Sequence, residues 1–146
     1  MFKKILFAGL IATTSSFAVG SAFAGCNDDV ALQQNGVRNQ ALVDSRGNCN
    51  YFSGVQTGSR NRVGSRTAGV VNAHVSGQYG YANTLETDVN GRGNGIGAVQ
   101  EGAGSRAYLS ANGVNNKIAA YQYGNGNRTS VAINGSGNSV VTNQRR

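Results

Sequence analysis

Proline and tryptophan are absent from this 146-residue sequence, and only 13% of its residues are charged. Without proline, the backbone N–H groups all remain available as donors, which suits a chain whose backbone is paired in sheets. The charged fraction is too low for a solvated disordered tail, and large apolar side chains are too few to fill a conventional core. The sequence is rich instead in glycine, at 22 positions, which is about twice the usual share.

The first 24 residues have the pattern of a secretory signal peptide. Lys3 and Lys4 form a basic start, residues 5–18 are largely apolar, and residues 22–24, Ala-Phe-Ala, match the small-x-small pattern of a cleavage site. The apolar run is too short for a transmembrane helix. We expect cleavage between Ala24 and Gly25, which leaves residues 25–146 as the exported repeat domain. Loss of the two lysines lowers the formal charge from +7 to +5.

Glycine recurs every eleven residues over the whole of this expected mature chain. Because the period is unbroken, we interpret residues 25–146 as one array of half-repeats. Each of these glycines is expected in a tight turn, where a left-handed backbone is needed. The glycine column consists of Gly25, Gly36, Gly47, Gly58, Gly69, Gly80, Gly91, Gly102, Gly113, Gly124 and Gly135.

Two amide columns share this register. Three residues after each column glycine stands an asparagine, with Asp28 and Ser105 as exceptions, and glutamine fills one position in every second half-repeat. The full structural unit is therefore 22 residues. The asparagine column is Asn39, Asn50, Asn61, Asn72, Asn83, Asn94, Asn116, Asn127 and Asn138, and the glutamine column is Gln34, Gln56, Gln78, Gln100, Gln122 and Gln144.

The residues between the turns alternate in character, which predicts strands. Asn94, Ile96, Ala98 and Gln100 fall on one face, whereas the intervening positions are mostly polar or charged. A helix is excluded because each glycine would cost roughly 1 kcal/mol relative to alanine. The alternative is a disordered chain rich in glycine and asparagine, but the alternation is locked to the glycine register, which argues against it.

We therefore predict an all-β fold, a two-sheet β-solenoid of 22-residue coils built from eleven 11-residue half-repeats, each with a seven-residue strand and a four-residue turn. Coils about 4.8 Å apart stack Gln on Gln and Asn on Asn, as in cross-β amyloid. The amides must be paired, because an unsatisfied buried amide costs about 1–3 kcal/mol. Six strands fall in the glutamine-bearing sheet and five in the other, whose matching column is variable: Ser45, Thr67, Val89, Ala111 and Ile133.

An outward column carries basic side chains. Arg62, Arg106 and Arg128 share it with Gln40 and Thr84. Like charges stacked in register repel, so this column either slows premature aggregation or simply keeps the face solvated. The positive charge also suits non-specific binding of anionic polymers such as extracellular nucleic acid or lipopolysaccharide.

The two cysteines fall in equivalent turns of adjacent coils. Cys26 and Cys49 are offset by a single position in the repeat, which puts them within disulfide range, and export permits oxidation. We predict one disulfide that fastens the first coil to the second. The alternative is that residues 23–26, Phe-Ala-Gly-Cys, act as a lipobox and make Cys26 a lipidated N-terminus.

Candidate catalytic groups are few. His74 is the only histidine, and the alternation places it inward beside Phe52 and Ile96, so we interpret it as a neutral core residue. The acidic residues occupy scattered positions that match no calcium loop, and no catalytic set, metal cluster or phosphate loop is found. We expect no enzymatic activity, no cofactor, no metal and no small-molecule substrate.

These features together resemble the curlin family, the subunits of bacterial curli amyloid fibres. The closest matches to its repeat are residues 122–127 (Gln-Tyr-Gly-Asn-Gly-Asn) and 78–83 (Gln-Tyr-Gly-Tyr-Ala-Asn), and Gln34, Gln56 and Gln100 open similar stretches. Two departures are that the family's second glutamine is replaced by the variable column, and that no glycine-rich targeting segment stands between residue 24 and the repeats.

The resemblance implies a secreted subunit of cell-surface fibres, or fimbriae, of a Gram-negative bacterium, with a role in adhesion and the biofilm matrix. Its partners would be further copies of itself, a curli-type secretion channel and the complementary fibre subunit. The basic balance and the Arg145 and Arg146 ending are similar to the minor, nucleating subunit, so the major and nucleating roles both stay open. From the residues alone, repeats without capping elements predict end-to-end stacking, and the alternative is a monomeric β-solenoid that binds surfaces.

Overall fold

All regular structure is β-strand in the computed structural model, which describes residues 4–9 and 27–146. Each strand from β2 onward corresponds to one half-repeat. The strands are β1 (Lys4–Gly9), β2 (Asp29–Val37), β3 (Gln40–Asn48), β4 (Tyr51–Ser59), β5 (Arg62–Val70), β6 (Ala73–Tyr81), β7 (Thr84–Arg92), β8 (Gly95–Ala103), β9 (Arg106–Val114), β10 (Lys117–Tyr123), β11 (Arg128–Ser136) and β12 (Ser139–Arg145).

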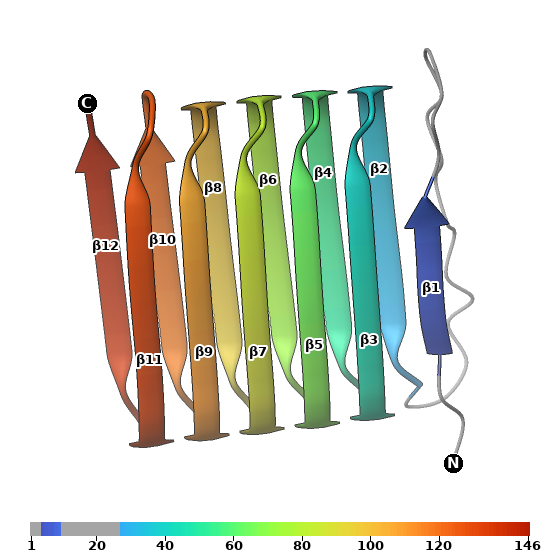
Figure 1. Cartoon of the computed structure of the whole chain (residues 1–146). Helices are drawn as coiled ribbons and strands as arrows, with labels where there is room; N and C mark the ends of the chain where they lie inside the picture. The colour runs from blue at the N-terminus through green and yellow to red at the C-terminus, as the bar shows by residue number, and fades with distance from the viewer. Residues whose placement is uncertain (1–3, 10–26) are drawn as a thin grey trace.

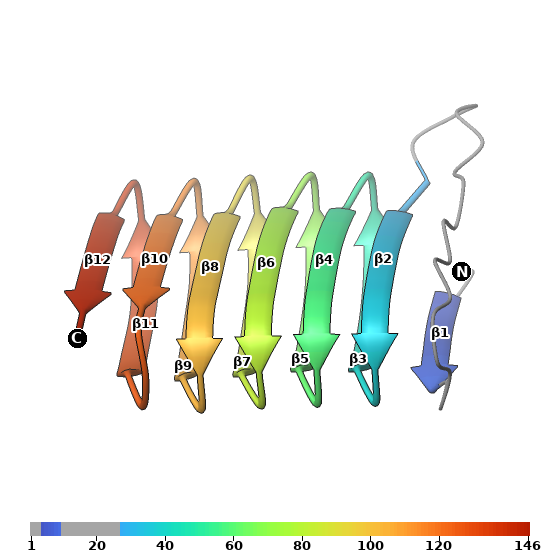
Figure 2. The ribbon, with the colours of Figure 1, turned by 90° about the horizontal axis from the view of Figure 1, so that it is seen from above.

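Successive strands alternate between two facing sheets. Sheet A contains β1, β3, β5, β7, β9 and β11, and sheet B contains β2, β4, β6, β8, β10 and β12, each in this spatial order (Figure 1). From β2 to β12, neighbours within a sheet pair in parallel at an offset of 22 residues, as Gln56 does with Gln78. Viewed from above, short arcs join the two layers on both sides (Figure 2). The predicted two-sheet β-solenoid of 22-residue coils is confirmed.

The first strand runs in the opposite direction to its neighbour. β1 pairs antiparallel with the outer edge of β3, with Lys4 opposite Ser45 and Gly9 opposite Gln40. It belongs to the segment that the sequence predicts to be a signal peptide. The predicted cleavage site at Ala24 and Gly25 lies outside the described residues.

The strands are longer than the seven residues predicted. Most span nine residues, because the column glycines remain inside the ladder, as Gly36 does opposite Gly58. Gly36 has a φ of 112°, which glycine accepts while its strand stays paired, and the chain then bends at Arg38 with a φ of 59°. The arcs that follow nine-residue strands are two residues long, shorter than predicted, whereas the arc between β10 and β11 has the predicted four residues.

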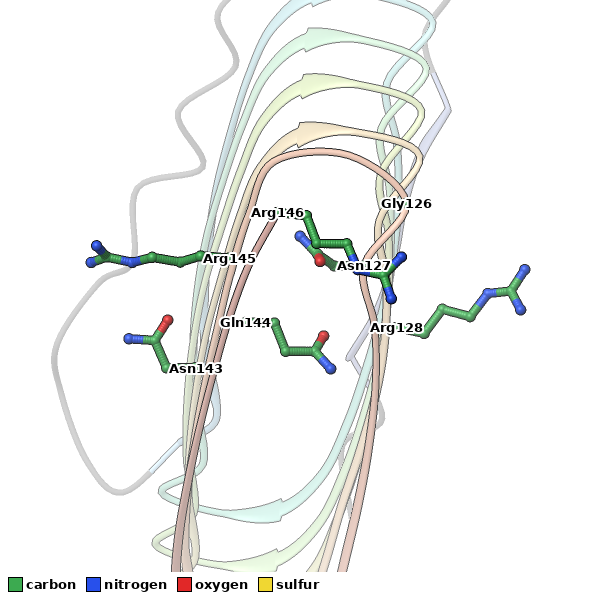
Figure 3. A pocket seen from close by; sticks show the side chains of 7 residues that line it. All are labelled: Gly126, Asn127, Arg128, Asn143, Gln144, Arg145 and Arg146. Carbon is green, nitrogen blue, oxygen red and sulfur yellow. The ribbon is translucent and has the colours of Figure 1, made fainter.

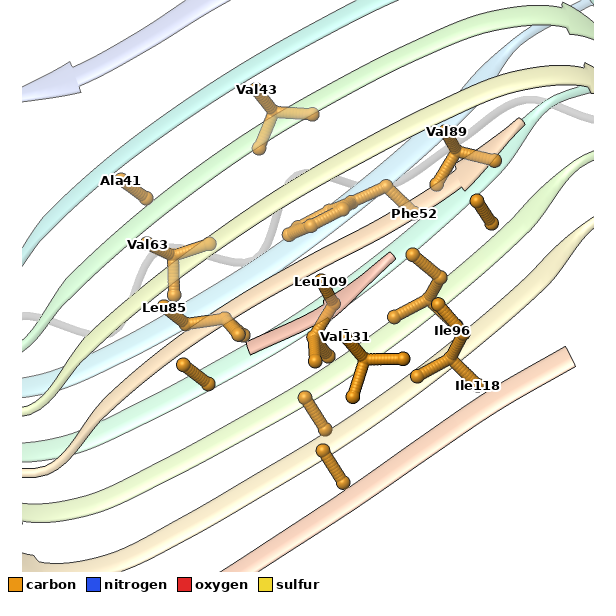
Figure 4. Close-up of a cluster of buried hydrophobic side chains, with 14 of the residues drawn as sticks. Ala41, Val43, Phe52, Val63, Leu85, Val89, Ile96, Leu109, Ile118 and Val131 are labelled. Atoms are coloured by element: carbon orange, nitrogen blue, oxygen red, sulfur yellow. The ribbon is translucent and has the colours of Figure 1, made fainter. Parts of the chain in front are cut away.

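The interior lies between the two sheets. Inward positions alternate with outward ones along each strand, and the largest apolar side chains, Phe52, Leu85 and Leu109, are at most 1% exposed. These side chains point from both sheets into one continuous apolar cluster (Figure 4). Like residues also stack between coils, as Ile96 does with Ile118. The apolar cluster and the amide columns thus share the same narrow interior.

The outward faces of the two sheets differ in charge. Sheet A carries Arg62, Arg66, Glu86 and Asp88 on neighbouring strands. Sheet B carries several exposed tyrosines and valines, including Tyr51, Val75, Tyr79, Tyr121 and Val141. No residue in the ranges 4–9 and 27–146 is helical, and accordingly no helix in this part of the chain is long and apolar enough to cross a membrane.

Candidate functional site: amide ladders and open sheet edges

The six glutamines of sheet B form one continuous hydrogen-bonded ladder. Gln56 Nε2 donates to Gln78 Oε1 at 2.8 Å, and Gln78 Nε2 donates to Gln100 Oε1 at 2.8 Å. The same bond links Gln34 to Gln56, Gln100 to Gln122, and Gln122 to Gln144. The four central side chains are at most 1% exposed, so each ladder bond satisfies amide groups that water does not reach.

Each central glutamine also ties the two sheets together. The second N–H of Gln56 Nε2 reaches the carbonyl oxygen of Gln40 in sheet A at 3.0 Å, and Gln78 reaches that of Arg62 at 3.0 Å. Gln100 and Gln122 repeat this contact with Thr84 and Arg106. Both N–H groups of each amide are therefore hydrogen-bonded, one to the next glutamine along the axis and one to a backbone carbonyl oxygen of the opposite sheet.

The asparagine column forms a ladder of a different kind from the one predicted. Asn61 donates its backbone N–H to Asn39 Oδ1 at 3.0 Å, and Asn61 Nδ2 donates to the carbonyl oxygens of Gly80 and Thr57. The asparagine side chain thus links neighbouring coils through hydrogen bonds to their backbone N–H and carbonyl groups. Direct stacking bonds between asparagine side chains occur only from Asn72 to Asn50 and from Asn138 to Asn116 within residues 27–146.

The column glycines are required by the close approach of neighbouring coils. Gly91 has a φ of 121°, and a Cβ added there would overlap the carbonyl oxygen of Gly113. The same overlap recurs along the column from Gly36 to Gly113, each with the glycine of the next coil. Asparagine Nδ2 bonds to these same carbonyl oxygens, for example Asn94 to Gly113 at 2.9 Å. Glycine and asparagine thus form one structural unit; Gly25 lies outside the described residues.

Asp28 takes the place of asparagine in the first coil. Its Oδ1 accepts the backbone N–H of Asn50 at 2.9 Å, as an asparagine oxygen does in later coils, and its Oδ2 accepts the Ser45 hydroxyl at 2.8 Å. Cys49, in the arc just before Asn50, is disulfide-bonded. Cys26, the only other cysteine in the sequence, is outside the residues that the structure describes.

A small polar site surrounds the buried histidine. His74 is fully buried in the inward column between Phe52 and Ile96, and its Nδ1 lies 2.8 Å from Ser65 Oγ and 3.2 Å from Thr87 Oγ1. Burial lowers the pKa of His74 to about 3, so the ring is neutral at physiological pH. Sequence analysis missed Ser65 and Thr87, although both share the inward parity of sheet A and are 22 residues apart.

The last coil leaves backbone edges and a hollow exposed. Among the described residues, β11 pairs only with β9 and β12 only with β10, so each has an outer edge without a neighbour. A hollow of about 570 Å³ lies between these edges, lined by Gly126, Asn127, Arg128, Asn143, Gln144, Arg145 and Arg146. Gln144 points into the space between the sheets, whereas Arg128 and Arg145 point away from it (Figure 3).

Two charged columns lie side by side on the outer face of sheet A. The first is the predicted basic column, in which Arg106 lies between Thr84 and Arg128. The second alternates in sign, because Arg66 lies between Asp44 and Asp88. Asp44 also pairs with Arg46 Nη2 at 2.7 Å on its own strand. The face is therefore a patterned surface rather than a uniformly positive one.

No group of three or more metal-ligating side chains occurs among the described residues. The arrangement there consists of hydrogen-bonded ladders, close glycine contacts and open strand edges. Such a surface can add strands, because an unpaired edge offers a complete row of donors and acceptors. No family model, no curated protein and no solved structure matches this chain.

Proposed function

We propose that this chain is an exported structural subunit that stacks end to end with other copies of itself to form a cross-β fibre at the cell surface, as curlin subunits do. The observation that carries the proposal is the pair of open edges on β11 and β12, which lie at the end of in-register ladders. A second copy would pair with both edges and cover the hollow at Gln144.

The ladder chemistry supports growth by addition of identical units. Within the chain each coil binds the next through the same glycine, asparagine and glutamine contacts. A copy that meets the open edge therefore finds the same backbone groups that pair its own coils. In fibres of this kind every backbone group pairs with the layer above and below. Adhesion and the biofilm matrix are the roles that such a fibre would serve, either as the main subunit or as the nucleator.

Proline at the open edge tests the proposal without breaking an internal bond. The first residue of each inner strand donates its N–H to the next coil, as Lys117 does to Asn138 and Arg106 does to Asn127. Arg128 and Ser139 hold the same position on β11 and β12, so their N–H groups point toward the open end. Proline is tolerated at the first residue of a strand, and the variant Arg128→Pro, Ser139→Pro should fold.

The expected result is that this variant stays monomeric in sedimentation and dye-binding assays while the parent chain forms fibres with a 4.8 Å meridional reflection. The control is Arg128→Ala, Ser139→Ala, which removes the same side chains and keeps both N–H groups. It should still form fibres, because both N–H groups remain available and an exposed ion pair contributes at most about 1 kcal/mol. A parent chain that stays monomeric and dye-negative for days at micromolar concentration would refute the proposal.

A further inference from the structure

Both ends of the repeat array belong to the same sheet. β2 lies at one edge of sheet B and β12 at the other edge, because the run from β2 to β12 contains an odd number of strands. In sheet A, the strands that face these ends are β3 and β11. The two ends are therefore offset by half a coil, and this offset restricts how one copy can continue another.

Simple translation along the axis would leave a missing strand. If a second copy followed with its sheets aligned on those of the first, its β2 would pair with β12 in sheet B. In sheet A, β11 and the β3 of the second copy would then stand about 9.6 Å apart, which is twice the normal spacing of about 4.8 Å. Neither of these two strands would have a neighbour at the junction.

A half-turn removes this vacancy. On the basis of the fibre proposed above, we infer that successive copies are related by a rotation of 180° about the solenoid axis and a rise of five and a half coils, about 26 Å. The rotation exchanges the two sheets. It also preserves strand direction, because the strands of sheet A run opposite to those of sheet B (Figure 1). β2 of the second copy then pairs with β11, and its β3 pairs with β12.

The 11-residue register carries through this junction and matches outward side chains. Arg128, the last member of the basic column, falls beside Asp29 of the second copy. Ser130 falls beside Ala31, since each holds the third position of its strand. On the other sheet, exposed Val141 falls beside exposed Leu42. The junction thus joins a base to an acid and an apolar side chain to an apolar side chain.

The inward side chains and the glycine column also continue. Val131 meets Leu32 of the second copy, and both are core residues that are less than 9% exposed within one molecule. Gly135 meets Gly36, which preserves the close carbonyl contact seen from Gly36 to Gly113. The glutamine ladder does not continue, because Gln144 would meet Ser45 and Gln34 would meet Ile133 instead of each other. A single amide bond is exchanged for a complete strand pairing, and the equivalent internal pairing of β9 with β11 spans nine residues.

The leading strand occupies the place that the junction needs. In the full chain β1 covers the outer edge of β3, where β12 of the preceding copy pairs after the half-turn. With β1 in place, translation would instead complete both sheets, because β1 fills the vacancy beside β11. The half-turn junction therefore belongs to the chain from which residues 1–24 have been removed.

Paired cysteine variants distinguish the two junctions. Ala31→Cys with Ser130→Cys places two thiols on neighbouring strands only after a half-turn, whereas Ala31→Cys with Val141→Cys does so only after translation. All three positions face outward, and Cys49 is already disulfide-bonded. Fibres of each double variant, prepared without residues 1–24, are treated with a short bis-maleimide and analysed by denaturing electrophoresis.

The half-turn predicts a covalent ladder of oligomers for the first variant and monomers for the second. Cryo-electron microscopy of the parent fibre should show two-fold screw symmetry with a rise of about 26 Å rather than about 29 Å. Fibres that give the reverse cross-linking pattern and pure translation would overturn the inference and leave the proposed function standing. Absence of fibres in every preparation would overturn both. The full chain, with β1 present, should give no ladder for the first variant.

Discussion

The column glycines accept no side chain, because neighbouring coils touch at the backbone there. Gly91 combines a φ of 121° with a carbonyl oxygen in the space of a Cβ. Gly91→Ala should therefore destabilise the fold by about 3 kcal/mol or more, as measured by denaturant unfolding. Gly95→Ala is the control, since nothing lies within 4 Å of a Cβ at that position. A similar loss in the two variants would contradict this account.

The glutamine ladder is expected to tolerate no apolar replacement. Gln78→Leu leaves the Nε2 of Gln56, the Oε1 of Gln100 and the carbonyl of Arg62 each short of one partner. The expected loss is about 3–5 kcal/mol of unfolding free energy, at the usual cost of buried unpaired groups. Gln33→Leu changes an outward glutamine and should alter stability by less than about 0.5 kcal/mol. Equal stability of the two variants would show that the ladder is dispensable.

His74 should make the fold sensitive to mild acid. Its pKa is near 3 in the folded chain and about 6.5 when unfolded, so the unfolded state binds the extra proton between these values. Stability is constant above pH 6.5 and falls on acidification by about 1.4 kcal/mol per pH unit, which is about 2 kcal/mol by pH 5. His74→Ile, which copies Ile96 in the same column, should remove this slope. The measurement is denaturant unfolding of the parent chain and of His74→Ile at pH 7 and pH 5. Equal losses of unfolding free energy in the two chains would exclude His74 as the cause.

Single residues show where sequence reasoning reached its limit. The alternation predicts that His74 points inward. Its contact with Ser65 and Thr87 could not be predicted, because it depends on how the two sheets face each other across the interior. The asparagine column was likewise visible as a column. Its bonds to glycine carbonyls were not, because an amide of that length can reach either another amide or the adjacent arc.

At the scale of the strand, the outward columns of sheet A should respond oppositely to the same substitution. Arg106→Glu places an acid beside Arg128, whereas Arg66→Glu places an acid between Asp44 and Asp88. The first should raise stability by about 0.5 kcal/mol and the second lower it by a similar amount at low salt. Both effects should shrink in 1 M salt. The measurement is thermal unfolding of the two variants at both salt concentrations. Changes in melting temperature of the same sign would contradict the predicted charge pattern of the two columns.

Strand existence was easier to predict than strand length. The alternation and the glycine period place every strand from β2 to β12, yet the predicted length of seven residues is short for most of them. The reason is that glycine signals a turn in a sequence, whereas here Gly58 pairs with Gly80 inside the ladder before the chain bends at Arg60. A period specifies spacing and leaves open which residues of each unit form the arc.

At the scale of the whole molecule, charge should control the rate of stacking. The expected mature chain carries a formal charge of +5, two less than the +7 of the full sequence, so approaching copies repel. The Debye length falls from about 30 Å at 0.01 M salt to about 8 Å at 0.15 M. We expect the lag before fibre growth to shorten over this range, as followed by dye fluorescence. A lag that lengthens with salt would mean that attraction between unlike charges governs the approach.

The architecture as a whole was accessible from the sequence, since a 22-residue period with inward amides has few other solutions. The β1 strand was not, because residues 4–9 carry no part of the repeat and read as the apolar core of a leader. The sequence pattern also does not determine how one copy contacts the next. The arrangement of such a junction follows from the placement of β2 and β12 in the same sheet.

All the ladder amides of sheet B point the same way, from the nitrogen of Gln34 to the oxygen of Gln56 and onward to Gln144. Their dipoles add along the solenoid axis, as peptide dipoles do along a helix. The β2 end of the ladder consequently presents the amide oxygen of Gln34 as an acceptor, and the β12 end presents the amide N–H groups of Gln144 as donors. A filament built from such units is electrically polar, so its two tips should elongate at unequal speeds.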